Sequence, residues 1–354
     1  MQRSLFPGFE DELRPMTCKH YEVIVAFDVV QIERFLPYQS PFPNGRPPAN
    51  RDALARAFLA KAVLNLPTTV GLINRLKVDT ALRRLCGFPG KIPCEATFSN
   101  ASAEFAKLGL TDKIHETLVN EAFEDKLVGH VSRDATAIEG REKPLKNPAK
   151  AAEAKPTSKR GRPRKDEKRS PKEATRLEKQ MTMNLSEMLA DLPTKCDVGA
   201  KKNSQGNAEY WIGYKLHLDV DDNGIPLTAL TTSASMHDSQ AAIPLETMTN
   251  SRVDSLYSVM DAAYNSSLIE QVVADAGKVA IIDPKKPRGG EKIPLDPAKQ
   301  KRFKIRTVVE RTNAAIKDDF GGRFVRVRGH EKVSTHLMFG VIAMTALRLV
   351  DVFT

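Results

Sequence analysis

Two alternating segments separated by a tight turn predict a β-hairpin in the second half of the chain. From Tyr210 to Val220 apolar and polar side chains alternate, and Pro226 to Ser233 again has β character. The turn Asp222-Asn223-Gly224 places Asn-Gly where a hairpin favours residues with positive φ. This part of the chain is therefore expected to be built on a sheet.

Further strands and helices are predicted on both sides of the hairpin. The expected strands are Leu127 to Ile138, Leu256 to Met260 and Val279 to Asp283, and the expected helices begin near Pro244, at Ser267 and at Phe303. The last helix is expected to be long and to follow a Lys/Pro/Gly loop that ends near Arg302. This order indicates an α/β fold with a mixed sheet.

The first 125 residues have helical spacing instead. Apolar residues recur at helical intervals in Arg51–Asn65, Thr97–Leu108 and Thr111–Phe123, and Thr68 or Thr69 can cap a helix that runs through Leu76. The proline-rich run from Pro41 to Pro48 cannot be a regular helix. We expect a small all-helical domain here.

Positive charge is concentrated in one segment of the 354-residue chain. The net charge is +10, and Arg141 to Gln180 holds 15 Lys and Arg against 6 Asp and Glu, so this segment accounts for +9. Its few large apolar residues predict a flexible insertion. Lys159, Arg160, Arg162 and Arg164 form a run similar to an AT-hook, which binds the minor groove of A·T-rich DNA. The alternative is a solvated linker that contacts phosphates without sequence preference.

The remaining composition predicts a soluble intracellular protein with no membrane segment. No run of about 18 apolar residues occurs, and acidic residues interrupt the start of the chain where a signal peptide needs an apolar core. The four cysteines are too scattered for a disulfide framework or a zinc site.

Three carboxylates are the candidate catalytic residues. Asp134 lies on the first strand, Asp261 follows the strand that ends at Met260, and Glu310 lies on the last predicted helix. A right-handed crossover between parallel strands would bring the two aspartates together. Converging carboxylates are usually held by a hard divalent cation, and two such ions can support phosphodiester chemistry. Alternatively, each strand-end aspartate is only a turn or cap residue.

The helix that carries Glu310 has acidic and basic side chains on one face. Arg306, Glu310, Asn313 and Lys317 are spaced by 4, 3 and 4 residues. This pattern is also compatible with a surface ion pair between Arg306 and Glu310, which would have no catalytic role. Similarly, His237 and Asp238 could join a metal site or form a cap and turn before the next helix.

The order of several motifs resembles bacterial insertion-sequence transposases of the DDE class. Phe303, Arg306, Glu310 and Lys317 have the spacing of that family's tyrosine, arginine, glutamate and lysine signature, with Phe303 in the tyrosine position. The blocks around the family's carboxylates, two intervening blocks and the helical N-terminal domain also have similar stretches. These are 132–136, 260–266, 213–217, 236–239, 85–88 and 92–98. The family's tyrosine hydroxyl is missing at Phe303, and Ala262-Ala263 follows Asp261 where glycine is commoner.

The resemblance implies a ribonuclease-H-like core and a DNA-cutting activity. Asp134, Asp261 and Glu310 would be the catalytic metal ligands for Mg²⁺, which Mn²⁺ could replace, with two ions expected. Cleavage at transposon ends would be followed by transfer of the 3′-hydroxyl into target DNA. Arg306, Lys317 and Phe303 would bind DNA. The partners would be the inverted-repeat ends and target duplex, bound by a homodimer in the bacterial cytoplasm near the nucleoid.

We therefore predict four regions. They are a helical domain at 1–125 that binds DNA ends, a catalytic core at 126–138 and 181–330, a basic insertion at 139–180 and a C-terminal helix at 331–354. Two other functions stay open. One is a metal-dependent nuclease without strand transfer, and the other is a non-catalytic DNA-binding repressor derived from a transposase.

Overall fold

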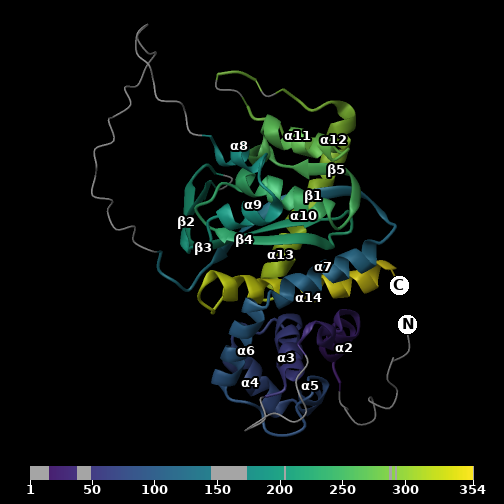
Figure 1. The fold of residues 1–354 in the computed structure, drawn as a ribbon, viewed down its shortest axis with the longest axis vertical. Helices are drawn as coiled ribbons and strands as arrows, with labels where there is room; N and C mark the ends of the chain where they lie inside the picture. Colours follow the sequence, from purple (N-terminus) through teal and green to yellow (C-terminus); the bar gives the residue numbers. More distant parts are fainter. Residues whose placement is uncertain are drawn as a thin grey trace, which may run out of the picture.

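The computed structural model describes residues 16–37, 49–144, 174–202, 205–286, 289–291 and 293–353. Figure 1 shows a sheet with helices around it in the upper half and a group of helices below, with the long helix α14 between them. The predicted α/β architecture with a preceding helical region is confirmed. The AT-hook-like residues Lys159, Arg160, Arg162 and Arg164 lie outside the described residues.

The lower group, which we call the helical unit, precedes the sheet in the chain. Its elements are α2 (Cys18–Val30), η1 (Ile32–Phe35), α3 (Arg51–Val63), α4 (Thr69–Val78), α5 (Thr80–Leu85), α6 (Glu95–Lys107) and α7 (Leu110–Phe123). The Thr68 side chain accepts a hydrogen bond from the Gly71 amide at 2.9 Å, so Thr68 caps α4 as one of the two predicted candidates.

The upper group, the sheet unit, is built on a mixed sheet. Its strands are β1 (Leu127–Glu139), β2 (Asp197–Lys202), β3 (Ala208–Val220), β4 (Pro226–Ser233), β5 (Asp254–Met260) and β6 (Val279–Ile282). The order is β2-β3-β1-β5-β6, and β4 pairs with β3 as the predicted hairpin. Strand β1 is antiparallel to β3 and parallel to β5.

Helices cover the sheet and connect its strands. They are α8 (Arg176–Gln180), α9 (Leu185–Asp191), η2 (Asp238–Ala241), α10 (Ala242–Asn250), η3 (Ala262–Tyr264), α11 (Ser267–Asp275), α12 (Pro297–Phe303), η4 (Lys304–Arg306), α13 (Thr307–Asp318) and α14 (His330–Phe353). Helix α13 packs on β1 and β3, whereas α10 packs on β4, α9 and α11.

The expectation of one long helix beginning at Phe303 is wrong. Helix α12 begins at Pro297, within the predicted loop, because Asp296 caps it by accepting hydrogen bonds from the Ala298 and Lys299 amides at 3.0 Å. It ends at Phe303, and the 3₁₀ turn η4 separates it from α13. The two helices pack on different strands, α12 on β6 and α13 on β1 and β3, and this tertiary packing divides the helical run.

Helix α14 is the shared core element of the two units. Phe339, Ile342 and Ala343 pack in the cluster formed by the helical unit, whereas Leu337 and Val341 pack with β3 and α13. The helix is long and apolar enough to cross a membrane by length and composition, but much of its surface is buried against the rest of the protein. Its apolarity is explained by packing on two sides.

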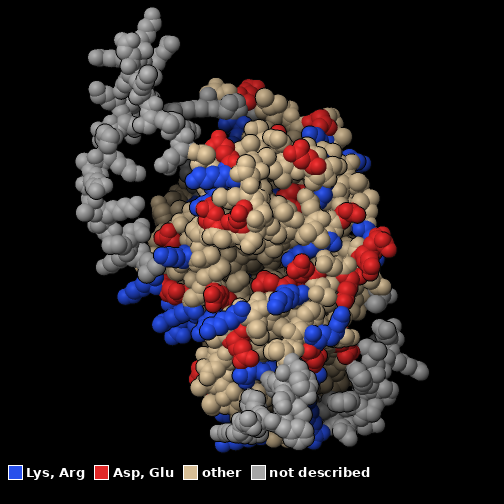
Figure 2. All heavy atoms as spheres, viewed as in Figure 1, with Lys and Arg blue, Asp and Glu red and all other residues tan. Residues whose placement is uncertain are grey.

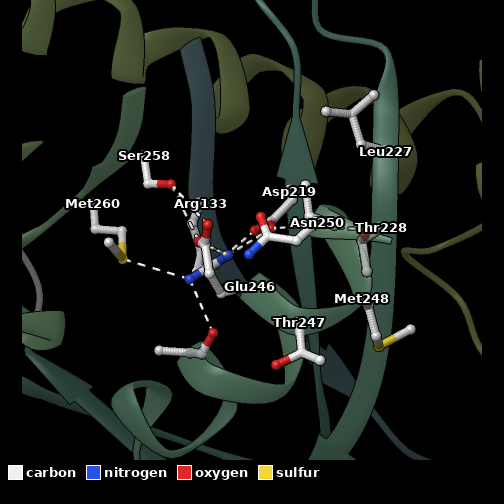
Figure 3. A network of polar contacts seen from close by, with 12 residues as sticks. Arg133, Asp219, Leu227, Thr228, Glu246, Thr247, Met248, Asn250, Ser258 and Met260 are labelled. Carbon is white, nitrogen blue, oxygen red and sulfur yellow. Dashed lines mark hydrogen bonds and ion pairs between the residues drawn. The ribbon is translucent and has the colours of Figure 1, made fainter. Parts of the chain in front are cut away.

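A buried ion network joins β1 to β3 and α10 (Figure 3). Arg133 and Asp219 are cross-strand neighbours, and the guanidinium donates to both carboxylate oxygens at 2.7 and 2.6 Å. It also donates to Glu246 at 2.9 Å and to the Ala242 carbonyl at 3.0 Å. Burial alone would lower the pKa of Arg133, but the two carboxylates outweigh it and raise this pKa above its usual value.

Removing Arg133 should strongly destabilise the fold. In Arg133→Ala the carboxylates of Asp219 and Glu246, each at most 1% exposed, lose their main cation, which costs about 3–5 kcal/mol for a buried pair. Chemical denaturation should show this loss in the free energy of unfolding. The control Arg34→Ala, which breaks an exposed pair with Glu121, should leave the midpoint almost unchanged. Equal effects of the two variants would contradict the assigned role of the network.

Candidate active site

The two candidate aspartates meet where β5 ends. Ser132 of β1 is paired with Val259 of β5, and Asp134 and Asp261 each follow two residues later. The parallel pairing that was predicted to bring them side by side is confirmed. The Asp261 carboxylate also accepts a hydrogen bond from the Ala263 amide at 2.8 Å, which holds it at the start of η3.

Asp134 lies on the face of β1 that α13 covers. Its side chain is 23% exposed, and one carboxylate oxygen accepts a hydrogen bond from Asn313 Nδ2 at 3.1 Å. Burial raises the pKa of Asp134 to about 6, although Arg306 opposes the shift, and the negative charges of Asp261 and Asp238 add to it. The site therefore disfavours the ionised form of this carboxyl.

Asp238 is a third carboxylate close to this pair. It begins η2 and forms an ion pair with Lys215 Nζ at 2.7 Å, and the same ammonium donates to the Met236 carbonyl at 2.7 Å. Tyr264 is buried beside the group: burial, and then the charges of Asp238, Asp134 and Asp261, raise its pKa. Asp238 thus belongs to the acidic site, one of the two possibilities left open by the sequence.

His237 takes the other of those possibilities. Its ring Nδ1 lies 2.8 Å from Ser239 Oγ and accepts from the Ser239 amide at 3.3 Å, so the exposed ring caps the η2 turn. The cap and turn interpretation holds for His237 but not for its neighbour Asp238.

Glu310 lies on the far side of a cation from Asp134. Its half-exposed carboxylate is hydrogen-bonded to Arg306, and the other guanidinium nitrogen of Arg306 is 3.9 Å from Asp134 Oδ1. Within the described part of the chain, no three His, Cys, Asp or Glu side chains are close enough together to hold a metal ion. The assignment of Asp134, Asp261 and Glu310 as joint metal ligands stays a prediction.

Asn313 adds an oxygen that sequence reasoning placed on this face but gave no role. While its amide nitrogen donates to Asp134, its Oδ1 is buried and has no hydrogen-bond partner among the described residues. A buried acceptor without a partner is costly, and carboxylate and amide oxygens are the ligands that Mg²⁺ prefers. The residues around Asp134 therefore fit a hard divalent cation.

The remaining predicted DNA-binding residues on this chain segment occupy different places. Phe303, at the end of α12, is partly buried. Lys317 is half-buried near the end of β1: burial, and then the charges of Lys201 and Arg323, lower its pKa, and Glu139 lies close enough to oppose this. Arg306 contacts the acidic site, whereas Lys317 belongs to a separate group of cations.

Ionisation of Asp134 should cost stability when no divalent cation is present. Between pH about 4 and 6 the folded state retains the Asp134 proton that the unfolded chain releases, so this residue makes the protein less stable as the pH rises. Asp134→Asn should therefore gain melting temperature relative to the unchanged protein between pH 4.5 and 7 in the presence of a chelator. A difference that does not vary with pH would contradict the raised pKa.

Two comparisons with protein families match this chain. Residues 134–346 match the family model of the transposase DDE domain. Residues 11–104 match the family model described as a transposase domain (DUF772). No curated protein and no solved structure matches the chain.

Proposed function

This chain belongs to the DDE transposase family, and on that basis we propose that it cuts DNA at transposon ends and transfers the 3′-hydroxyl ends into target DNA. The family implies a ribonuclease-H-like core and a metal-dependent enzyme that cuts DNA. The observation that carries the finer proposal is the juxtaposition of Asp134 and Asp261 on adjacent parallel strands, beside the free oxygen of Asn313.

The proposed metal ligands are Asp134, Asp261 and Glu310, with Asn313 Oδ1 as a further oxygen. Bound there, Mg²⁺ ions, or Mn²⁺ in their place, would stabilise the attacking and leaving oxygens of the phosphodiester. Glu310 has to turn away from Arg306 to join the two aspartates. Its half-exposed position at the first turn of α13 leaves room for this movement.

Arg306 is proposed to bind a phosphate next to the cut. Its guanidinium now contacts Glu310 and lies near Asp134, so it already sits among the candidate ligands. When Glu310 turns away, the planar guanidinium can donate two hydrogen bonds to a phosphate. Lys317 would bind DNA farther along the same face of α13.

The wider assembly follows from the same proposal. Residues 1–125 would bind the transposon ends, and a homodimer would hold two ends together in the cytoplasm near the nucleoid. A nuclease without strand transfer would cut the ends but leave target DNA intact, and a repressor would bind without cutting. Pre-cut ends with free 3′-hydroxyls, mixed with Mg²⁺ and a target plasmid, separate these functions: joined products support the transposase.

Loss of any one of the three carboxylates should abolish cutting. Asp134→Ala, Asp261→Ala and Glu310→Ala each remove a proposed metal ligand, so Mg²⁺-dependent cleavage of a duplex that carries the transposon end should fall to background. DNA binding, followed by fluorescence anisotropy, should be largely retained. The control Asp318→Ala, an exposed carboxylate at the end of α13, should cut normally. Near-normal cutting by one of the three variants would remove that residue from the site.

The roles of Arg306 and Lys317 can be separated from simple ion pairing. An i,i+4 pair between Arg306 and Glu310 contributes less than about 1 kcal/mol of stability, so Arg306→Ala should barely change the melting temperature. If both cations bind phosphates, Arg306→Ala and Lys317→Ala should each lower the cleavage rate strongly, more so for Arg306. Small and equal effects on stability and cleavage would leave Arg306 as a surface partner of Glu310.

A further inference from the structure

A groove of about 480 Å³ lies between the helical unit and the sheet unit. One wall comes from α3, the start of α4 and the first half of α6. The other wall comes from the residue pair after β1, the connection between α13 and α14, and the first turns of α14. Whatever occupies this groove contacts both units at once.

The side chains that line the groove are predominantly cationic. The five basic residues are Lys61, Arg141, Arg326, Arg328 and Lys332, and Glu95 is the one carboxylate among the lining residues. None of the five makes an ion pair within the part of the chain that the structure describes. Figure 2 shows Lys and Arg side chains gathered at the boundary between the two units. The groove therefore has an excess of positive charge without bound counter-charge.

Lys61 is the least exposed of these cations. Its side chain belongs to α3, the residue is 5% exposed, and its Nζ lies 3.3 Å from His336 Nδ1. Burial lowers the pKa of Lys61 to about 8 and that of His336 to about 3, so at neutral pH Lys61 is mostly charged while His336 is neutral. A buried ammonium whose described partner is neutral is stabilised when an anion binds beside it.

The start of α4 adds backbone donors to the same groove. Thr68, Thr69 and Val70 line it, and the Thr68 side chain is already engaged with the Gly71 amide. The amides of Thr69 and Val70 have no acceptor inside the helix because they belong to its first turn. The partial positive charge at this helix end favours an anion in the groove, as the five cations do.

We propose that this groove binds the sugar–phosphate backbone of the duplex whose end is cut, with one phosphate beside Lys61. The proposal rests on the proposed function for the identity of the polyanion. A duplex suits the groove better than a single small anion, because the exposed cations Arg141, Arg326 and Arg328 continue the charge beyond Lys61 along the surface.

The position of the groove relative to the acidic site is compatible with one continuous duplex. Arg141 follows Asp134 by seven residues of mostly extended chain, which span roughly 20 Å. The cations Lys317, Lys201 and Arg323 lie close to one another near Glu139, between these two points on β1. Since stacked base pairs are about 3.4 Å apart, the groove would bind phosphates roughly six base pairs from the cut.

The test uses two groove variants of the full chain and one matched control. Lys61→Met keeps the length of the side chain but removes the buried charge, and the double variant Arg326→Gln with Arg328→Gln changes exposed residues that the fold does not need. The control, Lys107→Gln with Lys113→Gln, removes two exposed charges from the far end of α6 and from α7. Fluorescence anisotropy measures binding of a duplex that carries one transposon end, over a range of salt concentrations.

Both groove variants should weaken duplex binding roughly tenfold or more, and the slope of log K against log salt should fall by about 0.9 for each phosphate that the variant no longer neutralises. The control should bind almost as the unchanged protein does. Lys61→Met should keep or raise the melting temperature, because a merely structural lysine would lower it on removal. Equal losses in the groove double variant and in the control would overturn the proposal.

Two further arms separate other outcomes. If inorganic phosphate raises the melting temperature of the unchanged protein but not of Lys61→Met, while both bind the duplex equally, the groove is a small-anion site and the proposal fails. Cleavage is measured separately. Groove variants that lose duplex binding support this inference even if no protein cuts the DNA. Variants that bind and cut normally overturn it and leave the proposed function standing.

Discussion

The buried pairing of Arg133 with Asp219 and Glu246 holds the position of β1, on which the candidate site depends. Three charges are removed from water at this point, and they are tolerated because each finds a partner at hydrogen-bond distance. Side chains alternate along a strand, so holding Arg133 against α10 directs Asp134 to the opposite face, beside α13. Neighbouring residues thus have different roles, one in the fold and one in the proposed chemistry.

The charges around Asp134 are balanced by contacts from several elements. Lys215 of β3 pairs with Asp238, Arg306 lies between Asp134 and Glu310, and Asn313 donates to Asp134. On the opposite side of the sheet unit, α14 packs into the cores of both units and places the basic groove at their boundary. A duplex that spans the groove and the acidic site would use the rigid connection through α14.

Several features could be predicted because they depend on neighbouring residues. The hairpin follows from Asn223-Gly224, the cap of α4 from Thr68, and the adjacency of Asp134 and Asp261 from the rules for parallel strands. Other features were missed. Strand β2 has no clear alternation, and the break at η4 follows from the packing of α12 and α13 on different strands. No local signal gives Asn313 a role, because its partner Asp134 is 179 residues away.

Local chemistry was enough to determine the α/β class, the helical region before the sheet, the family and the candidate carboxylates, because periodicity, turn residues and motif spacing act over a few positions. The tertiary structure decided which charges meet. It joined Asp238 to the aspartate pair, placed Arg306 between Asp134 and Glu310, and left Lys61 buried next to a neutral histidine. These outcomes depend on burial and on distances between segments far apart in the chain, and those quantities exist only once the two units have packed against α14.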